Sequence, residues 1–214
     1  MKFNFYKIYK ILLKNFGFQN WWPAKTKFEI IVGAILTQQT SWKNVEKAIQ
    51  NLRKNKMLSK EKIKKAKIKE IEKLIKNVNF YKTKARRLKL LVKEMEKIER
   101  IKNKKNKEEI KKRLLSLKGI GEETAEVLML YYFNQLDFVI DSYTLRIFER
   151  IYKRKFRRNE LKELIQKSIP RSLRIYKDFH AQLDELGKRF CKKEPRCNEC
   201  ILNKICEYAN TKQK

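Results

Sequence analysis

The clearest chemistry in this sequence lies in a cluster of cysteines near its C-terminal end. The chain contains four cysteines, and they are Cys191, Cys197, Cys200 and Cys206. Cysteines scattered through a fold indicate buried thiols or disulfides, whereas thiolates gathered this tightly indicate the ligands of one metal centre. Basic residues surround the cluster, namely Lys188, Arg189, Lys192, Lys193 and Arg196. We expect these cations to help keep the sulfurs deprotonated and to present a positive surface beside the centre.

The second chemical signal is the segment Leu117-Lys118-Gly119-Ile120-Gly121, which lies between two expected helices. Two glycines flanking one apolar residue allow a hairpin too tight for residues with a Cβ, with Ile120 filling the core. Such a hairpin exposes peptide N–H groups at the start of the next helix, where an anion binds. The alternative is an ordinary turn between helices with a glycine C-cap. The hairpin is also the expected place for a monovalent cation.

The overall charge indicates a polyanionic partner. The chain has 55 Lys and Arg against 24 Asp and Glu, a formal net charge of +31. The excess is spread along the chain, with dense runs at Lys60–Lys69, Lys82–Lys93 and Lys102–Arg113. Solvated helix faces alone would balance the two signs, so an imbalance this large makes nucleic acid the leading partner. In that setting the hairpin is predicted to bind a DNA phosphate through Lys118, Gly119, Ile120 and Gly121.

Other features of the sequence favour a protein inside the cell with no membrane partner. The longest apolar run, Ile30–Leu36, is far too short to cross a bilayer. Lys7, Lys10 and Lys14 interrupt the N-terminal apolar residues, which excludes a signal peptide. We therefore expect a cytoplasmic, nucleoid-associated monomer. A basic helix lying on a membrane surface is the alternative for the N-terminal segment.

The elements that must position these residues are all predicted to be helices, so the fold class is all-α. Apolar residues at helical spacing predict a first helix near Phe5–Phe16, and a uniformly apolar segment predicts a buried helix at Phe28–Thr37. No segment shows sustained strand alternation. Further helices are expected at Asn44–Lys54, from Ser59 onward, and at Ile68–Lys76, Lys84–Ile98, Glu108–Ser116, Glu122–Phe133, Ser142–Tyr152, Glu160–Ser168 and Ile175–Gly187.

Together these motifs resemble those of a known family, the endonuclease III branch of the helix-hairpin-helix DNA glycosylases. The resemblance rests on the hairpin and the Thr124-Ala125 that follows it, on Asp141 and Arg146, and on the C-terminal cysteines. Phe80-Tyr81-x-x-Lys84-Ala85 matches another stretch of that family. The similarity extends from about Trp21 to Cys206.

The resemblance implies a fold of two helical lobes. A helical barrel with the helix-hairpin-helix motif would span residues 25–135. Residues 1–24 and 136–214 would form the second lobe, with a 4Fe–4S loop at residues 190–207. The cleft between the lobes would receive a damaged base that is flipped out of double-stranded DNA.

The spacing of the cysteines departs slightly from the family pattern. The spacing here is C-x5-C-x2-C-x5-C, whereas the usual endonuclease III pattern has six residues between its first two cysteines. A four-cysteine zinc site is the alternative, since zinc accepts such spacings. The adjoining Gly187–Phe190 and Pro195-Arg196 resemble the cluster family and favour iron–sulfur. The expected role is structural, to order a basic loop against phosphate.

The resemblance also assigns a catalytic carboxylate. Asp141 follows the apolar Phe138–Ile140 and lies eighteen residues beyond Glu123, which is the family's interval. A carboxylate there would stabilise the positive charge that builds on the sugar as the glycosidic bond breaks. The alternative, compatible with catalysis, is an N-cap for the helix that begins at Ser142.

Glu123 departs from the bifunctional members of the family. Those relatives have a lysine at this position, and a carboxylate cannot form their Schiff base. Glu123 therefore favours a monofunctional enzyme that uses water. The structural alternative is an acidic residue that complements the dipole of the helix in whose first turn it lies.

The aromatic residues suggest the substrate. All three tryptophans lie at Trp21-Trp22 and at Trp42, and with Glu123 they resemble the 3-methyladenine glycosylases of the branch. Electron-rich rings attract a cationic N3-alkylated purine by about 0.5–2 kcal/mol per contact. Core packing is the alternative for the tryptophans. Gln39 matches the family position that fills the gap left by the flipped base, and a polar residue on a helix surface is the alternative.

The sequence therefore predicts a DNA glycosylase of base excision repair that hydrolyses the bond to a damaged base such as 3-methyladenine. A bifunctional glycosylase with AP lyase activity is one alternative, because another lysine could replace the missing one. A non-catalytic DNA-binding module is the other. The single histidine, His180, is expected to be packed or solvated and receives no chemical role.

Overall fold

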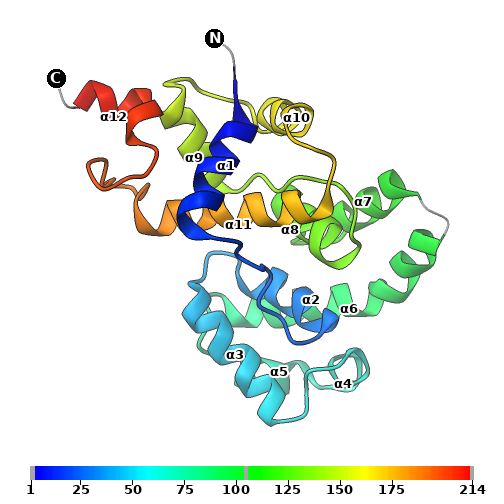
Figure 1. Ribbon diagram of the computed structural model, residues 1–214. Coiled ribbons are helices and arrows are strands. Elements are labelled where there is room, and N and C mark those ends of the chain that lie inside the picture. The colour runs from blue at the N-terminus through cyan, green and yellow to red at the C-terminus, as the bar shows by residue number, and fades with distance from the viewer. Residues whose placement is uncertain (1–2, 104–105, 213–214) are drawn as a thin grey trace. The chain divides into compact units, whose positions relative to one another are not determined.

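The computed structural model describes residues 3–103 and 106–212, and this part of the chain is helical with no strand. It contains twelve α-helices, one π-helix and one 3-10 helix (Figure 1). The prediction of an all-α fold is confirmed. Among the described residues, no helix has both the length and the apolar character that crossing a membrane requires. The chain divides into two compact units: unit 1 is Met1–Pro23 with Leu136–Lys214, and unit 2 is Ala24–Gln135.

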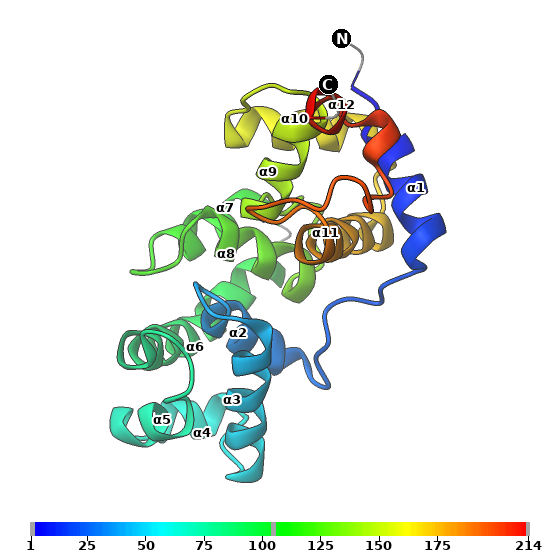
Figure 2. The same cartoon turned by 90° about the vertical axis from the view of Figure 1, so that its left-hand side faces the viewer.

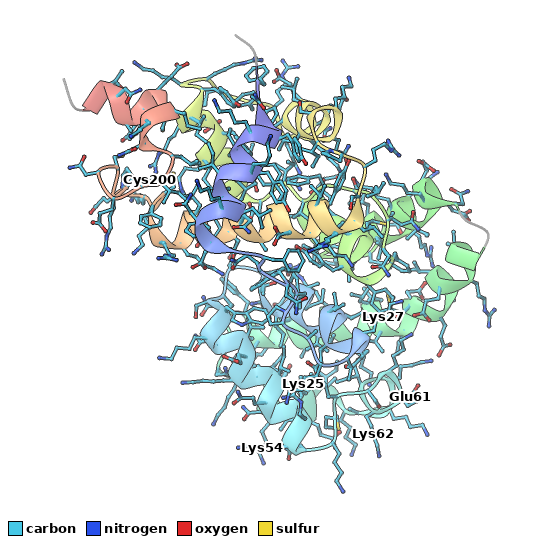
Figure 3. The ribbon with its side chains drawn as sticks, viewed as in Figure 1. Lys25, Lys27, Lys54, Glu61, Lys62 and Cys200 are labelled. Atoms are coloured by element: carbon cyan, nitrogen blue, oxygen red, sulfur yellow. The ribbon has the colours of Figure 1, made fainter. Side chains whose placement is uncertain are left out.

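Unit 2 is built around one long helix. Its α-helices are α2 (Lys27–Leu36), α3 (Trp42–Lys54), α4 (Lys60–Lys65), α5 (Ile68–Leu74), α6 (Tyr81–Asn103), α7 (Lys107–Leu115) and α8 (Glu122–Val127). Helix α6 packs against α2, α4, α5 and α7, and Figure 2 shows it beside α2 and α5. Lys54 and Lys62 are examples of the exposed lysines on this unit (Figure 3).

Helix α2 lies in the core of unit 2, as its uniform hydrophobicity predicts. Thr26 caps it by accepting a hydrogen bond from the Glu29 N–H. The residues from Ile31 to Leu36 are all buried. Glu29 on this helix is also buried, and its Oε1 accepts from Arg53 at 2.8 Å. A buried carboxylate in such a core is tolerated because it is paired.

The helix expected at Glu122–Phe133 is interrupted. It is α-helical only to Val127 and continues as a π-helix, η1 (Leu128–Tyr132). The Phe133 N–H donates to the Leu128 carbonyl five residues back at 2.9 Å, the wider turn of a π-bulge. Every residue of η1 is buried, so tertiary packing around this apolar run replaces the regular helical turn.

Unit 1 joins the two ends of the chain. Its helices are α1 (Phe5–Phe16), α9 (Ser142–Ile151), α10 (Arg158–Ser168), α11 (Leu173–Arg189), η2 (Asn203–Ile205) and α12 (Glu207–Lys212). The short α12 is not among the expected helices. Helix α11 packs against both α9 and α1. Between them lies an aromatic core in which the rings of Phe138 and Phe148 contact that of Phe179 at centroid distances of 5.6 and 6.2 Å.

Candidate functional site

Asp141 lies at the N-terminal end of α9 in unit 1. Its Oδ1 accepts a hydrogen bond from the Thr144 N–H at 2.7 Å, so the N-cap considered from the sequence is present. The preceding segment Phe138–Ile140 is buried, and Arg158 donates to the Ile140 carbonyl. These contacts fix the backbone on both sides of the carboxylate, whose side chain keeps 14% of its surface exposed.

His180 on α11 is an ionisable partner of Asp141. Its Nε2 lies 3.7 Å from Asp141 Oδ2, an ion-pair distance that is longer than a hydrogen bond. Burial alone would raise the pKa of Asp141. The charge and hydrogen-bonding capacity of His180, together with the Thr144 N–H, outweigh burial and hold that pKa below its ordinary value. The carboxylate therefore stays ionised although it is largely enclosed by protein.

His180 begins a row of charged groups along α11. Asp184 follows four residues later and Lys188 four residues after that, so the three share one helix face. Lys188 Nζ pairs with Asp184, and it lies 5.3 Å from the centre of the Trp21 ring. Burial raises the pKa of Asp184, an effect that Lys188 and His180 partly offset. Unit 1 thus brings together Asp141, the histidine, and one of the tryptophans through this row.

The hairpin of unit 2 has the geometry that its glycines predict. Gly119 has φ +90°, a left-handed conformation that residues with a Cβ rarely adopt. The Ile120 N–H donates to the Leu117 carbonyl at 3.0 Å, and the Ile120 side chain is buried. Within the described residues, the backbone N–H groups of Gly119 and Gly121 make no hydrogen bond. Lys118 is exposed beside them, so donors and a positive charge are available together.

Gln39 and Glu123 also belong to unit 2. Gln39 lies just after α2, is exposed, and adopts a left-handed φ of 51°. Glu123 is exposed in the first turn of α8, next to Glu122, which pairs with Lys111 at 3.1 Å. An acidic residue there complements the helix dipole, as the structural alternative for Glu123 requires.

The tryptophans are divided between the two units. Trp21 and Trp22 are half-buried in unit 1, with their rings 5.6 Å apart. Trp42 is half-buried in unit 2, where it is the first residue of α3. Each side chain therefore keeps some accessible surface, as a base-stacking residue requires, and each is also partly packed.

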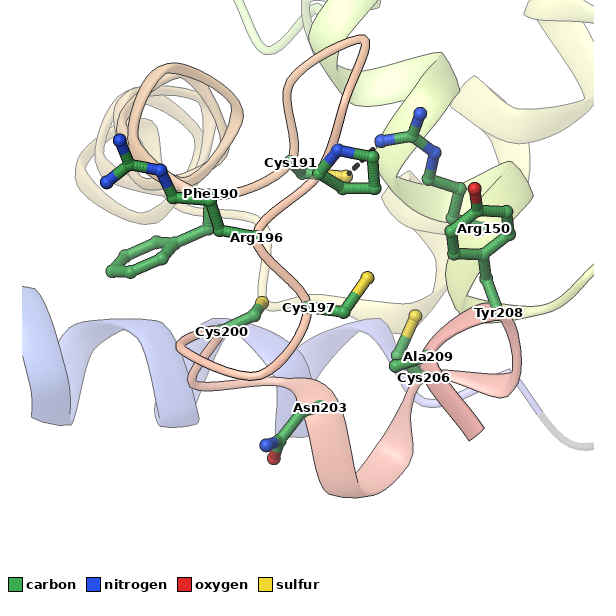
Figure 4. Close-up of a pocket in the computed structure, with 11 residues that line it drawn as sticks. Arg150, Phe190, Cys191, Arg196, Cys197, Cys200, Asn203, Cys206, Tyr208 and Ala209 are labelled. Carbon is green, nitrogen blue, oxygen red and sulfur yellow. Dashed lines mark hydrogen bonds between the residues drawn. The ribbon is translucent and has the colours of Figure 1, made fainter. Parts of the chain in front are cut away.

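The four cysteines line one small cavity in unit 1 (Figure 4). Arg150 on α9 holds one side of it: the guanidinium donates to Cys191 Sγ at 3.3 Å and to the Lys192 and Lys193 carbonyls at 2.6 and 3.0 Å. Arg146, one turn earlier, donates to the Cys191 carbonyl at 2.8 Å. The cavity is also lined by Tyr208, and Arg150 stacks over its ring at 5.1 Å.

Burial affects the acidity of two of the four thiols. Burial raises the pKa of Cys200 to about 11 and raises that of Cys206 as well. The basic residues around the loop are exposed, so they do not overcome the effect of burial on these two sulfurs. Four thiols without an oxygen ligand form a soft donor set, which suits an iron–sulfur cluster or zinc. As they stand, the described His, Cys, Asp and Glu side chains form no group of three or more that could hold a metal ion, so the four thiols share one cavity but would have to draw together around a bound centre.

Three residues to which the sequence assigned no role lie beside the predicted ones. They are His180 near Asp141, Arg150 at the cysteine cavity, and Phe80 just before α6. Phe80 is 66% exposed with a left-handed φ of 55°, and its neighbour Asn79 donates to the Gln39 carbonyl at 2.7 Å. A sequence signal existed for His180, since it has the helical spacing of Asp184 and Lys188. Arg150 carries no such signal in a chain this rich in arginine and lysine.

Comparisons with known proteins agree with this arrangement. Residues 32–171 match the model of the HhH-GPD superfamily of base excision DNA repair proteins. A Methanocaldococcus jannaschii protein that carries the provisional name DNA repair glycosylase is 43% identical over 94% of both chains. Endonuclease III of Thermotoga maritima is 30% identical, and the match covers 85% of this chain and 83% of that protein.

Solved structures show the same fold. The Helicobacter pylori 3-methyladenine DNA glycosylase MagIII, bound to 1,N6-ethenoadenine, has a TM-score of 0.77 and 25% identity, covering 87% of this chain and 98% of that one. Endonuclease III trapped as a covalent intermediate with DNA has a TM-score of 0.81 and 20% identity, covering all of both chains. Since the family model spans more than half of this sequence and its relatives align over most of their length, the chain belongs to the HhH-GPD superfamily of base excision DNA repair proteins and is an endonuclease III-like DNA glycosylase.

Proposed function

We propose that this protein is a monofunctional DNA N-glycosylase that hydrolyses the bond between deoxyribose and a flipped, alkylated purine such as 3-methyladenine in double-stranded DNA. The observation that carries the proposal is the Asp141 carboxylate, kept ionised by His180 and the Thr144 N–H in a largely enclosed position. A fixed negative charge is what an oxocarbenium-like transition state needs beside it.

The contacts of the Asp141 carboxylate suit it to stabilise charge on the sugar. Its Oδ1 is held by the Thr144 N–H, and Oδ2 faces His180 at 3.7 Å, so the carboxylate has one orientation. The carboxylate would stabilise positive charge at C1′ and orient a water molecule toward it. The charge is already in place before reaction, so no reorganisation is required as the bond breaks.

The DNA would be held and opened by unit 2. The N–H groups of Gly119 and Gly121, with Lys118, suit a backbone phosphate and carry no sequence preference. Gln39 would fill the space left by the extruded base. The exposed ring of Phe80 would enter the adjacent stack, because an apolar wedge partly offsets the cost of unstacking.

The tryptophans support a cationic base as substrate. The faces of indole rings attract positive charge, as the Lys188 ammonium 5.3 Å from the centre of the Trp21 ring illustrates, and the other tryptophan rings would offer the same attraction to a cationic base. An N3-alkylated purine carries such a charge and leaves readily without a strong general acid. The similarity to the H. pylori 3-methyladenine glycosylase, whose structure holds a modified adenine, points to the same substrate class.

The cysteine cavity is the proposed site of a 4Fe–4S cluster held by Cys191, Cys197, Cys200 and Cys206. All four thiols line one cavity, and the adjoining residues of the loop resemble those of the cluster family. The cluster would order the basic loop at residues 190–207 and take no part in bond cleavage. Arg146 and Arg150 hold the loop to α9 and so join it to the helix that Asp141 caps.

The test of this proposal is a base-release screen over duplexes that each contain one lesion. The wild-type protein should release free alkylated purine. Asp141→Asn should reduce release by about 100-fold or more, because it removes the charge at the transition state. Asparagine is a good N-cap, so the helix and DNA binding should be retained. Unchanged release by Asp141→Asn would refute the catalytic assignment, and no release from any lesion would leave a non-catalytic DNA-binding module.

Borohydride trapping on abasic DNA separates the monofunctional from the bifunctional alternative. The wild-type protein should give no covalent adduct, since Glu123 cannot form a Schiff base. Glu123→Lys should give one, because position 123 is exposed at the start of α8 and accepts a longer side chain. Glu123→Gln is the matched control and should remain untrapped. An adduct with the wild-type protein would mean that another lysine supplies AP lyase activity.

A further inference from the structure

Gln38 makes a set of contacts within unit 2 that the proposed reaction does not use. Its amide Nε2 donates to the Gly119 carbonyl and to Thr124 Oγ1, both at 3.0 Å. Its Oε1 accepts from Arg87 Nη1 at 2.7 Å. One amide therefore joins three elements far apart in sequence: the loop after α2, helix α6, and the hairpin with the helix that follows it.

Arg87 packs directly against the hairpin. A Cβ added to Gly119 would come within 2.2 Å of Arg87 Nε and 2.5 Å of its Cδ. Gly119 is thus required twice, once for its left-handed backbone and once because the arginine side chain packs against its Cα. Since Arg87 also donates to Gln38, the hairpin, the arginine and the loop after α2 form one packed assembly.

The same loop is also held by α6 and the turn before it. Lys84 Nζ donates to the Leu36 carbonyl at 2.8 Å and to Thr40 Oγ1 at 2.6 Å. Asn79 donates to the Gln39 carbonyl at 2.7 Å. These contacts fix the backbone around Gln39 while its side chain remains exposed. A non-glycine residue with φ 51° persists because its surroundings over-determine it.

We propose that Gln38 and Arg87 are positioning residues that hold the Gln39 loop at one fixed distance from the hairpin, so that gripping a phosphate and inserting Gln39 occur as a single event. This inference rests on the proposed function. The physical gain is preorganisation, since the loop needs no further ordering when the duplex opens. A freely moving loop would let the hairpin bind DNA without extruding the base.

The test measures binding and extrusion separately. Affinity is measured on undamaged duplex, and extrusion by the fluorescence rise of 2-aminopurine placed beside one alkylated purine. Gln38→Glu keeps the acceptor for Arg87 and the side-chain volume, but loses the donor to the Gly119 carbonyl. We expect it to reduce extrusion and single-turnover base release on the order of tenfold, with little change in affinity for undamaged duplex. Arg87→Met should have the same effect, and the double variant should be no worse than either single one.

Arg86→Met is the matched control, since Arg86 is an exposed neighbour on α6 and the change removes the same charge. It should weaken binding slightly and leave extrusion intact. If Gln38→Glu and Arg87→Met behave like Arg86→Met, or if affinity and extrusion fall together, the coupling is wrong. No fluorescence rise with the wild-type protein would also overturn the inference. A rise without released base would instead refute the proposed reaction, and the variants would still decide the coupling.

Discussion

The carboxylate of Asp141 has its two oxygens engaged by different partners. Oδ1 accepts the hydrogen bond from the Thr144 N–H that caps α9, and Oδ2 faces His180, which lies on α11. The sequence allows capping and catalysis at this residue, and the geometry is compatible with both: the cap orients the group and the histidine supports its charge. Burial disfavours the charged form of Asp141, and the Thr144 N–H and His180 stabilise that form.

This arrangement predicts a change in pH dependence when His180 is replaced. In His180→Gln the positive charge is lost and burial remains, so the pKa of Asp141 should rise above the value it has beside histidine. The protonated acid is inactive, so the acidic limb of the pH profile of single-turnover base release should move to higher pH. The rate on the plateau near neutral pH should change much less.

Arg189→Gln is the matched control for this experiment. It removes one positive charge from an exposed position in the last turn of the same helix, α11, and leaves the pair of Asp141 and His180 intact. Its pH profile should superimpose on that of the wild-type protein. Profiles of wild type and His180→Gln that also superimpose across the acidic limb would show that the histidine merely packs against α9.

At the scale of elements, Lys84 joins α6 to the end of α2. Its side chain is buried, and burial, with a contribution from the charge of Arg87, lowers its pKa to about 8. The ammonium donates two hydrogen bonds to the segment around Gln39 although burial disfavours its charge. Because burial disfavours the Lys84 ammonium that holds the segment around Gln39, the free energy of unfolding of unit 2 should depend on pH.

The direction of this pH dependence follows from the protons that Lys84 binds in the folded and unfolded states. Between pH 8 and 10.5 the folded state has released the Lys84 proton while the unfolded state still holds it, so the free energy of unfolding should rise with pH. Relative to Lys84→Met, the wild type should gain at most about 3 kcal/mol across this window. Urea unfolding at several pH values measures it. Lys82→Met, exposed on the same helix, is the control, and a flat difference between wild type and Lys84→Met would contradict the prediction.

At the scale of the whole molecule, a net charge of +31 would supply affinity for DNA but no chemistry. Salt will weaken binding steeply whether the protein is a hydrolase, a lyase or a non-catalytic module. The features that distinguish these classes are local side-chain arrangements, and in unit 1 they lie on a scaffold with an aromatic core around Phe138, Phe148 and Phe179.

The proposed metal centre gives a prediction at this scale. Protein purified without oxygen should show the broad visible absorbance of an iron–sulfur cluster. Cys200→Ser should lose that absorbance, because the cluster loses one of its four thiolate ligands. The melting temperature should fall and DNA binding should weaken as the basic loop loses its order.

Lys192→Ser is the matched control, because it changes an exposed residue of the same loop and keeps all four thiols. It should retain the absorbance. Stoichiometric zinc in place of iron and sulfide would select the alternative metal, and a Cys200→Ser protein with unchanged metal content would show that the four cysteines do not act as one site.

Much of this protein follows from its sequence alone. Helix positions depend on local apolar spacing and caps, which is why α2, α4 with its Ser59 cap, and α9 lie close to their expected positions. The hairpin is equally local, because a left-handed Gly119 is a property of a few residues. The cysteine cluster can be recognised in the sequence because one residue type recurs four times within one short segment.

Contacts between distant segments were decided by the tertiary structure. The approach of His180 to Asp141 depends on how α11 packs on α9, and the junction of Gln38, Arg87 and Gly119 depends on three elements meeting. The π-helix η1 and the raised pKa of Cys200 likewise result from burial. Periodicity records which face of a helix is apolar, but not which partner covers it, so the environment of each reactive group emerges only when the helices pack.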